Sequence, residues 1–110
     1  MVTICTGASI AAWAGILNGR NATTNKIRFH NIAAERPQVN WIRKARWVVD
    51  GNIWTSSGIA AGIDTILAFI EAMYGRESAV RTATIMEYEW HEDSTDDPFA
   101  LSDKVKMLAT

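Results

Sequence analysis

Val2-Thr3-Ile4-Cys5-Thr6-Gly7-Ala8 joins a short apolar run to a helical pattern, and the chain's single cysteine lies at the junction. Strand-to-helix corners of this kind hold a nucleophile on a sharp turn of an α/β fold, beside backbone N–H groups. A thiol at such a corner is favoured for nucleophilic chemistry in two ways. The helix N-terminus stabilises a thiolate, and the same amides can bind an oxyanion. Cys5 is therefore the candidate nucleophile, and Thr6 and Gly7 are the candidate amide donors.

The residues after this corner predict an alternation of short elements. Apolar spacing puts Ile10, Trp13, Ala14 and Leu17 on one helical face. We expect a strand at 2–4, a helix at 8–17, a short strand at 20–24, a helix at 26–35 and a strand or extended link at 39–42. The order strand, helix, strand, helix favours an α/β sheet rather than an all-helical or all-strand domain.

The clearest local signal is a hairpin. Two β-rich runs, Arg46–Val49 and Ile53–Thr55, flank Asp50-Gly51-Asn52, and an Asp-Gly pair is a strong hairpin turn. A helix is expected from 59 to 74, ended by Gly75, and another from 77 to 88. The apolar stripe of the first of these comprises Ile59, Ile63, Ile66, Leu67, Ile70 and Met73. We expect residues 91–98 to be a polar loop and residues 100–109 a frayed final helix.

Composition narrows the class of protein only modestly. The chain has 110 residues and a formal net charge of −1, which gives no sign of a nucleic-acid or membrane partner. A single cysteine excludes an internal disulfide and fits a reducing compartment. The N-terminus lacks a signal-peptide pattern, and no stretch is long and apolar enough to cross a bilayer. We expect a cytoplasmic protein.

The expected strands are too few for a complete parallel sheet, which needs cover on both faces. Either the chain assembles with a partner or a front half completes the sheet. A half-domain would also expose some of the five tryptophans to solvent, although Trp13, Trp41, Trp47 and Trp54 fall at positions typical of a core.

Five stretches together resemble the C-terminal half of the PfpI/ThiJ family, in the class I glutamine amidotransferase-like superfamily. They agree in order and spacing from Val2 to about Phe99. The stretches are Val2–Ala8, Ala14–Arg20, Ala22-Thr23-Thr24, Arg46–Ser56 and Gly58–Asp64. The resemblance implies a flavodoxin-like three-layer α/β/α sandwich, present here as a partial domain over 1–110 that begins at the nucleophile corner and carries a polar tail at 91–110.

Within that family, Cys5-Thr6-Gly7 looks like the isonitrile hydratase branch and its fungal relatives. The resemblance implies that a Cys5 thiolate attacks the isonitrile carbon, a carboxylate relays protons, and water adds to give an N-formamide. It also implies that Thr55, Ser56, Gly58 and Asp64 line the site, and it implies no metal or organic cofactor. Taken on its own, Asp64 fits better as an ordinary first-turn acid of a helix.

The chain departs from this pattern in two ways. In the family the acidic partner of the nucleophile lies in the N-terminal half, which this sequence does not contain. Members related to isonitrile hydratase often have Thr-Thr-His after the corner helix, whereas this chain has Thr23-Thr24-Asn25. Whether the chain is an active enzyme is therefore left open.

Several functions remain as expectations. The first is hydratase or hydrolase chemistry on a small electrophile through Cys5. The second is a catalytically inert, truncated or subunit form that acts by association, as a homodimer or with another chain. Other members of the family are glyoxalases, deglycases and stress chaperones, and a thiol-based oxidation sensor would need only an exposed, reactive Cys5.

Overall fold

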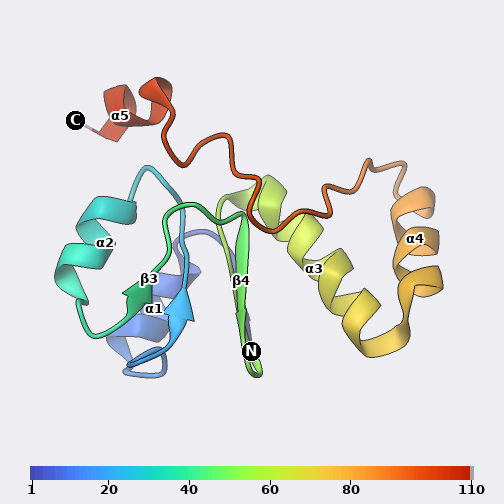
Figure 1. Ribbon diagram of the computed structural model, residues 1–110, viewed down its shortest axis with the longest axis horizontal. Helices are drawn as coiled ribbons and strands as arrows, with labels where there is room; N and C mark the ends of the chain where they lie inside the picture. Colours follow the sequence, from blue (N-terminus) through green and yellow to red (C-terminus); the bar gives the residue numbers. More distant parts are fainter. Residues whose placement is uncertain (110) are drawn as a thin grey trace.

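The computed structural model describes residues 1–109, which form five short strands and five helices (Figure 1). The strands are β1 (Val2–Thr3), β2 (Asn21–Ala22), β3 (Asn40–Trp41), β4 (Trp47–Asp50) and β5 (Ile53–Ser56). The helices are α1 (Gly7–Trp13), α2 (Phe29–Glu35), α3 (Ile59–Tyr74), α4 (Arg76–Ile85) and α5 (Asp103–Ala109). Every expected element is present, although most are shorter than the sequence pattern predicts.

Two small sheets organise these elements. The first has the order β1-β5-β4, in which β1 runs parallel to β5 and β4 runs antiparallel to it. The second pairs β2 with β3 in parallel. Asp50 pairs with Ile53 across the predicted hairpin, and Gly51 in its turn has a φ of 60°, which glycine adopts without strain. The hairpin prediction is confirmed.

The second sheet is tied to the hairpin by side-chain hydrogen bonds. The Asp50 carboxylate accepts from the Asn21 amide at 2.8 Å, and the Thr55 hydroxyl accepts from the Thr23 amide at 2.9 Å. These bonds hold β2 and the loop after it beside β4 and β5. The hairpin therefore fixes the position of residues 23–24, which matter for the cysteine corner.

Helix α1 ends earlier and faces differently from the prediction. It stops at Trp13, and Gly15 follows with a φ of 81°, so the helical spacing does not continue to Leu17. Ile10 is 75 % exposed and Trp13 is 65 % exposed. The core face instead consists of alanines, which let the helix lie close to the sheet. The main apolar cluster comprises Ala8, Ala11, Ala12, Leu17, Ala22, Val39 and Ile53, with Trp41 packed against it.

Helix α3 has the predicted bounds, but its apolar stripe is not a buried face. Ile59 is 77 % exposed, and Ile66 and Met73 are also exposed, whereas Ala61, Asp64, Thr65 and Leu67 are buried. Several apolar side chains of the stripe line an open groove of about 340 Å³ between β1, α3 and α4. The groove lining comprises Ile4, Ile59, Gly62, Ile63, Ile66, Leu67, Ile70, Thr82 and Met86.

The segment after α4 crosses the molecule instead of projecting from it. In Figure 1 it leaves α4, passes over the upper end of α3 and β4, and ends in α5 above α2. The Ser94 carbonyl accepts from the Arg46 amide at 2.6 Å, and Ala100 is buried. Residues 86–102 are irregular, as expected for a loop, but Asp97 is buried and not solvated. No helix among residues 1–109 is long and apolar enough to span a membrane.

Candidate functional site at the Cys5 corner

Cys5 lies at a sharp corner between β1 and α1. Its φ is 59°, in the left-handed region that non-glycine residues rarely occupy. The Gly7 amide donates to the Ile4 carbonyl at 3.0 Å and closes the turn around the cysteine. The thiol is unpaired and half-buried. A strained residue of this kind persists only where its surroundings hold it, and such residues gather at functional sites.

The two predicted amide donors differ in what they offer. The Gly7 amide is already bonded to the Ile4 carbonyl, so it is committed to the turn. Thr6 is exposed and precedes the first residue of α1. Across residues 1–109, the Thr6 amide donates to no acceptor. Thr6 is therefore the better placed of the two to receive a negatively charged oxygen beside Cys5.

A second contact holds the corner from the opposite side. The Thr24 hydroxyl donates to the carbonyl oxygen of Cys5 at 2.8 Å. Thr24 is fully buried and belongs to the loop after β2. The adjacent residue, Thr23, is bonded through its amide to the hydroxyl of Thr55. The predicted residue Thr55 is thus connected to the corner through the Thr23-Thr24 loop.

The other predicted site residues occupy different surroundings. Ser56 is fully buried, and its hydroxyl has no partner among the described residues. Gly58 precedes α3 and lines an open pocket of about 240 Å³ together with Asn25, Ser57 and Lys26. Asn25 holds its own loop, because its Oδ1 accepts from the Ile27 amide at 2.9 Å. Cys5 is not among the residues that line this pocket.

Asp64 is engaged in a buried ion pair. One carboxylate oxygen accepts from Nε and Nη2 of Arg46 at 2.9 and 2.7 Å, and the other accepts from the His91 amide at 2.8 Å. Its side chain is completely buried. The prediction of an ordinary first-turn acid is wrong, because Asp64 lies beyond the first turn of α3 and is buried. It joins α3 to the residue before β4 and to the segment after α4, and these contacts explain its presence without any role in proton transfer.

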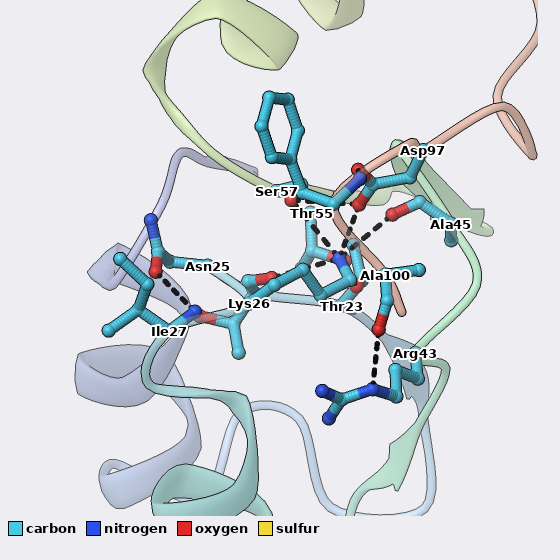
Figure 2. Close-up of polar contacts among 12 residues, drawn as sticks. Thr23, Asn25, Lys26, Ile27, Arg43, Ala45, Thr55, Ser57, Asp97 and Ala100 are labelled. Carbon is cyan, nitrogen blue, oxygen red and sulfur yellow. Dashed lines mark hydrogen bonds and ion pairs between the residues drawn. The ribbon is translucent and has the colours of Figure 1, made fainter. Parts of the chain in front are cut away.

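Sequence reasoning missed the most densely bonded side chain near the corner, Lys26. Figure 2 shows its ammonium at the centre of a ring of oxygens. Its Nζ lies 2.9 Å from Asp97 Oδ2 and between 3.0 and 3.1 Å from four further oxygens. Those four are the Thr23 and Ser57 hydroxyls and the Thr24 and Ala45 carbonyls.

Two features of its surroundings shift the pKa of Lys26 in opposite directions. Burial lowers the pKa of Lys26 below its ordinary 10.5, because an ammonium is poorly solvated there, while the Asp97 carboxylate raises it. Only 4 % of the residue is exposed. No local sequence pattern predicts this cluster, because its members are spread along the chain from residue 23 to residue 97. A lysine two residues after a pair of threonines was the only available signal.

The strand, the strained cysteine and the helix that follows define a class of protein: an α/β protein with a cysteine at a nucleophile corner. The family comparison narrows that class. Residues 1–72 match the family model described as the DJ-1/PfpI family. The chain belongs to this family, as the resemblance to PfpI/ThiJ proteins predicted.

Individual relatives agree with that assignment. Over 89 residues the chain is 35 % identical to the isonitrile hydratase of Pseudomonas putida, a match that covers 80 % of this chain and 37 % of the relative. A solved THiJ/PfpI family protein from Pseudomonas syringae superposes with a TM-score of 0.70 at 27 % identity, over 88 % of this chain and 37 % of that one.

Drosophila melanogaster DJ-1beta superposes with a TM-score of 0.69 at 20 % identity, over 81 % of this chain and 46 % of its own. These matches confirm the flavodoxin-like α/β fold class. The chain spans less than half the length of each of these three relatives.

Proposed function

We propose that this chain carries the nucleophile corner of an isonitrile hydratase-like protein and that Cys5 attacks a small electrophile. The observation that carries this proposal is the φ of 59° at Cys5, a strained, half-buried thiol at a strand-to-helix corner. The 35 % identity to an isonitrile hydratase supports the choice of substrate class. Nucleophilic catalysis suits a thiolate in such a place, because it divides one difficult step into two easier ones.

The proposed reaction is balanced in two steps. The Cys5 sulfur forms a bond to the isonitrile carbon while that carbon takes up one proton, which gives a thioimidate. Water then adds to the same carbon, the nitrogen takes up a proton, and the carbon–sulfur bond breaks to release an N-formamide and the thiol. In this proposal the Thr6 amide, which has no acceptor among residues 1–109, stabilises the oxygen that water brings.

The proton transfers need a general acid and base, which are typically worth about 10²- to 10⁴-fold in rate. Asp64 and Asp97 are both held in buried ion pairs, with Arg46 and Lys26. Neither is suited to relay protons at Cys5. We therefore expect this chain by itself to form the covalent intermediate more readily than to turn it over.

The test is to incubate the chain with a simple alkyl isonitrile and follow two products. Intact mass should show one adduct on the wild-type chain and none on Cys5→Ser, while proton NMR measures the formamide. Thr6→Ala keeps the amide and serves as the matched control, for which the same adduct is expected. If wild type and Cys5→Ser behave alike at high isonitrile concentration, the hydratase proposal is wrong.

A second candidate function, association without catalysis, is favoured by the exposed apolar surface. Ile10 and Trp13 on α1 are exposed, and an open apolar groove lies between β1, α3 and α4. Among the described residues, β1 pairs only with β5, so its other edge has no strand beside it. Exposed apolar patches of this kind mark interaction surfaces.

Light scattering over a range of concentrations tests this second candidate. We expect a mass above that of one chain, and we expect Trp13→Glu to lower it. Asn31→Glu, at an exposed position on α2, is the matched control for added charge. A single-chain mass at every concentration, for wild type and variants alike, would exclude self-association.

A further inference from the structure

The corner geometry depends on a chain of contacts that begins far from Cys5. Thr24 holds the Cys5 carbonyl at 2.8 Å, and the carbonyl of Thr24 in turn lies 3.1 Å from Lys26 Nζ. The same ammonium lies 3.1 Å from the hydroxyl of Thr23. Both residues of the loop behind the corner are therefore bonded to one buried lysine.

Lys26 is held in place by the segment after α4. Its Nζ lies 2.9 Å from Asp97 Oδ2, and both side chains are almost completely buried. Asp97 is fixed on two sides, because its Oδ2 accepts from the Ser57 hydroxyl at 3.2 Å and its Oδ1 from the Phe99 amide at 2.9 Å. Removing Asp97 would leave a buried charge unpaired, which is strongly unfavourable.

We propose that Lys26 is a positioning residue for the Cys5 corner, and that Asp97 sets its place, so that residues 93–100 control how the nucleophile is held. Lys26 does not touch the reacting atoms. It acts through Thr24, whose hydroxyl fixes the carbonyl of a residue in a strained conformation. The proposal deepens the proposed function and rests on it, because a positioned corner matters only if Cys5 reacts.

Five oxygens around one ammonium fit this role better than that of a general base or an anion site. A lysine ammonium has three N–H donors, and here all of them face protein oxygens. No donor is left for a ligand in the neighbouring pocket. The arrangement instead ties four separate stretches of the chain, around residues 23–24, 45, 57 and 97, to one point (Figure 2).

The test is a double-mutant cycle read out at Cys5 by its alkylation rate with iodoacetamide at pH 7. Lys26→Met and Thr24→Val should each lower the rate about fivefold, and the double variant should be no slower than the worse single one. Thr24→Ser, which keeps the hydroxyl, should restore the wild-type rate. Sites that act along one path give such non-additive effects.

If Lys26→Met does not fold, Asp97→Asn still tests the proposal. This substitution preserves the shape of the side chain and lies far along the chain from Cys5. It should lower the rate in the same direction. Ala79→Gly in α4, a buried position remote from the cluster, destabilises the chain without touching the cluster. That control should leave the rate unchanged in the folded protein.

Amide resonances of Cys5 and Thr6 separate this proposal from the proposed function. If wild-type Cys5 is no more reactive than in the denatured chain, but Asp97→Asn shifts both resonances and Ala79→Gly does not, the positioning role stands and the nucleophile role fails. Additive rate effects in the folded variants, or unmoved resonances in Asp97→Asn, would overturn the positioning role.

Discussion

At the scale of single residues, the molecule depends on two buried ion pairs with different neighbours. Arg46 and Asp64 join α3 to β4, whereas Lys26 and Asp97 join the loop behind Cys5 to the segment after α4. Burial lowers the pKa of Lys26, so its ammonium gains less from its partner than it loses in solvation. The pair specifies a geometry more than it adds stability.

Replacing both Lys26 and Asp97 should therefore lower the free energy of unfolding by less than replacing either one alone. We expect Lys26→Met or Asp97→Leu alone to lower the free energy of unfolding by about 3 kcal/mol, because each leaves one buried charge unpaired. We expect Lys26→Met/Asp97→Leu to recover part of that loss, because the unpaired charge is gone although four buried oxygens still lose the Lys26 donor. Urea unfolding followed by circular dichroism measures all four chains, and a double variant as unstable as the sum of the singles would contradict this account.

An exposed carboxylate gives a pH-dependent test. Glu92 is bonded to Arg76, and this hydrogen bond lowers the pKa of Glu92 below its ordinary 4.5. A carboxylate with a lowered pKa in the folded state contributes stability above its unfolded value, which is lost as the pH falls through the folded value. The contribution of the Arg76–Glu92 contact should therefore be present above about pH 4.5 and vanish at lower pH.

Carboxyl-detected NMR titration of Glu92 measures this directly. In the wild-type chain the midpoint should fall below 4.5, and in Arg76→Gln it should return toward that value. Asp93, whose pKa is lowered mainly by hydrogen bonds from Thr95 and not by Arg76, is a control carboxylate whose midpoint should not move in Arg76→Gln. An unchanged Glu92 midpoint in Arg76→Gln would show that the pair does not form in solution.

At the scale of elements, the sequence predicted those helices and strands that are bounded by a turn residue or a terminating glycine. Asp50-Gly51-Asn52 fixed the hairpin, and Gly75 ended α3 at the expected residue. The buried face of α1 was predicted wrongly. The spacing of apolar residues shows which side chains share a helix face, but not whether another part of the protein packs against that face. Ile10 and Trp13 lie in solvent, while small alanines make the contact.

The contact between α3 and Ile4, the residue that follows β1, gives a prediction about one glycine. A Cβ on Gly62 would lie 2.7 Å from Cγ2 of Ile4, too close for a real contact. We expect Gly62→Ala to cost about 1 kcal/mol of stability, since the clash exceeds the gain in helix propensity. In an Ile4→Ala background, which removes the clash, the same substitution should stabilise the chain.

Thermal unfolding of wild type, Gly62→Ala, Ile4→Ala and the double variant completes that cycle. Gly58→Ala provides a matched glycine, since a Cβ there meets nothing closer than 3.9 Å. A destabilising effect of Gly62→Ala that persists unchanged without the Ile4 side chain would show that Ile4 and α3 are not packed as described.

At the scale of the whole molecule, the family and the strand-to-helix corner at Cys5 could be predicted from sequence, but the distant contacts that hold this corner could not. Cys5 was identifiable because the residues around it are contiguous. Lys26, Ala45, Ser57 and Asp97 converge only in the folded chain, and each is unremarkable in its own stretch. The same holds for Asp64, whose partners Arg46 and His91 reveal its structural role.

The proposed function requires that the Cys5 corner be assembled in this chain and that its thiol be reactive. The most direct measurement is the rate of Cys5 alkylation by iodoacetamide at pH 7, in the native chain and in the chain unfolded by urea. We expect a native rate about tenfold higher, although the thiol is half-buried, because the Thr6 amide beside the sulfur, with no acceptor in residues 1–109, is free to stabilise negative charge. A native rate equal to or below the unfolded rate would contradict it.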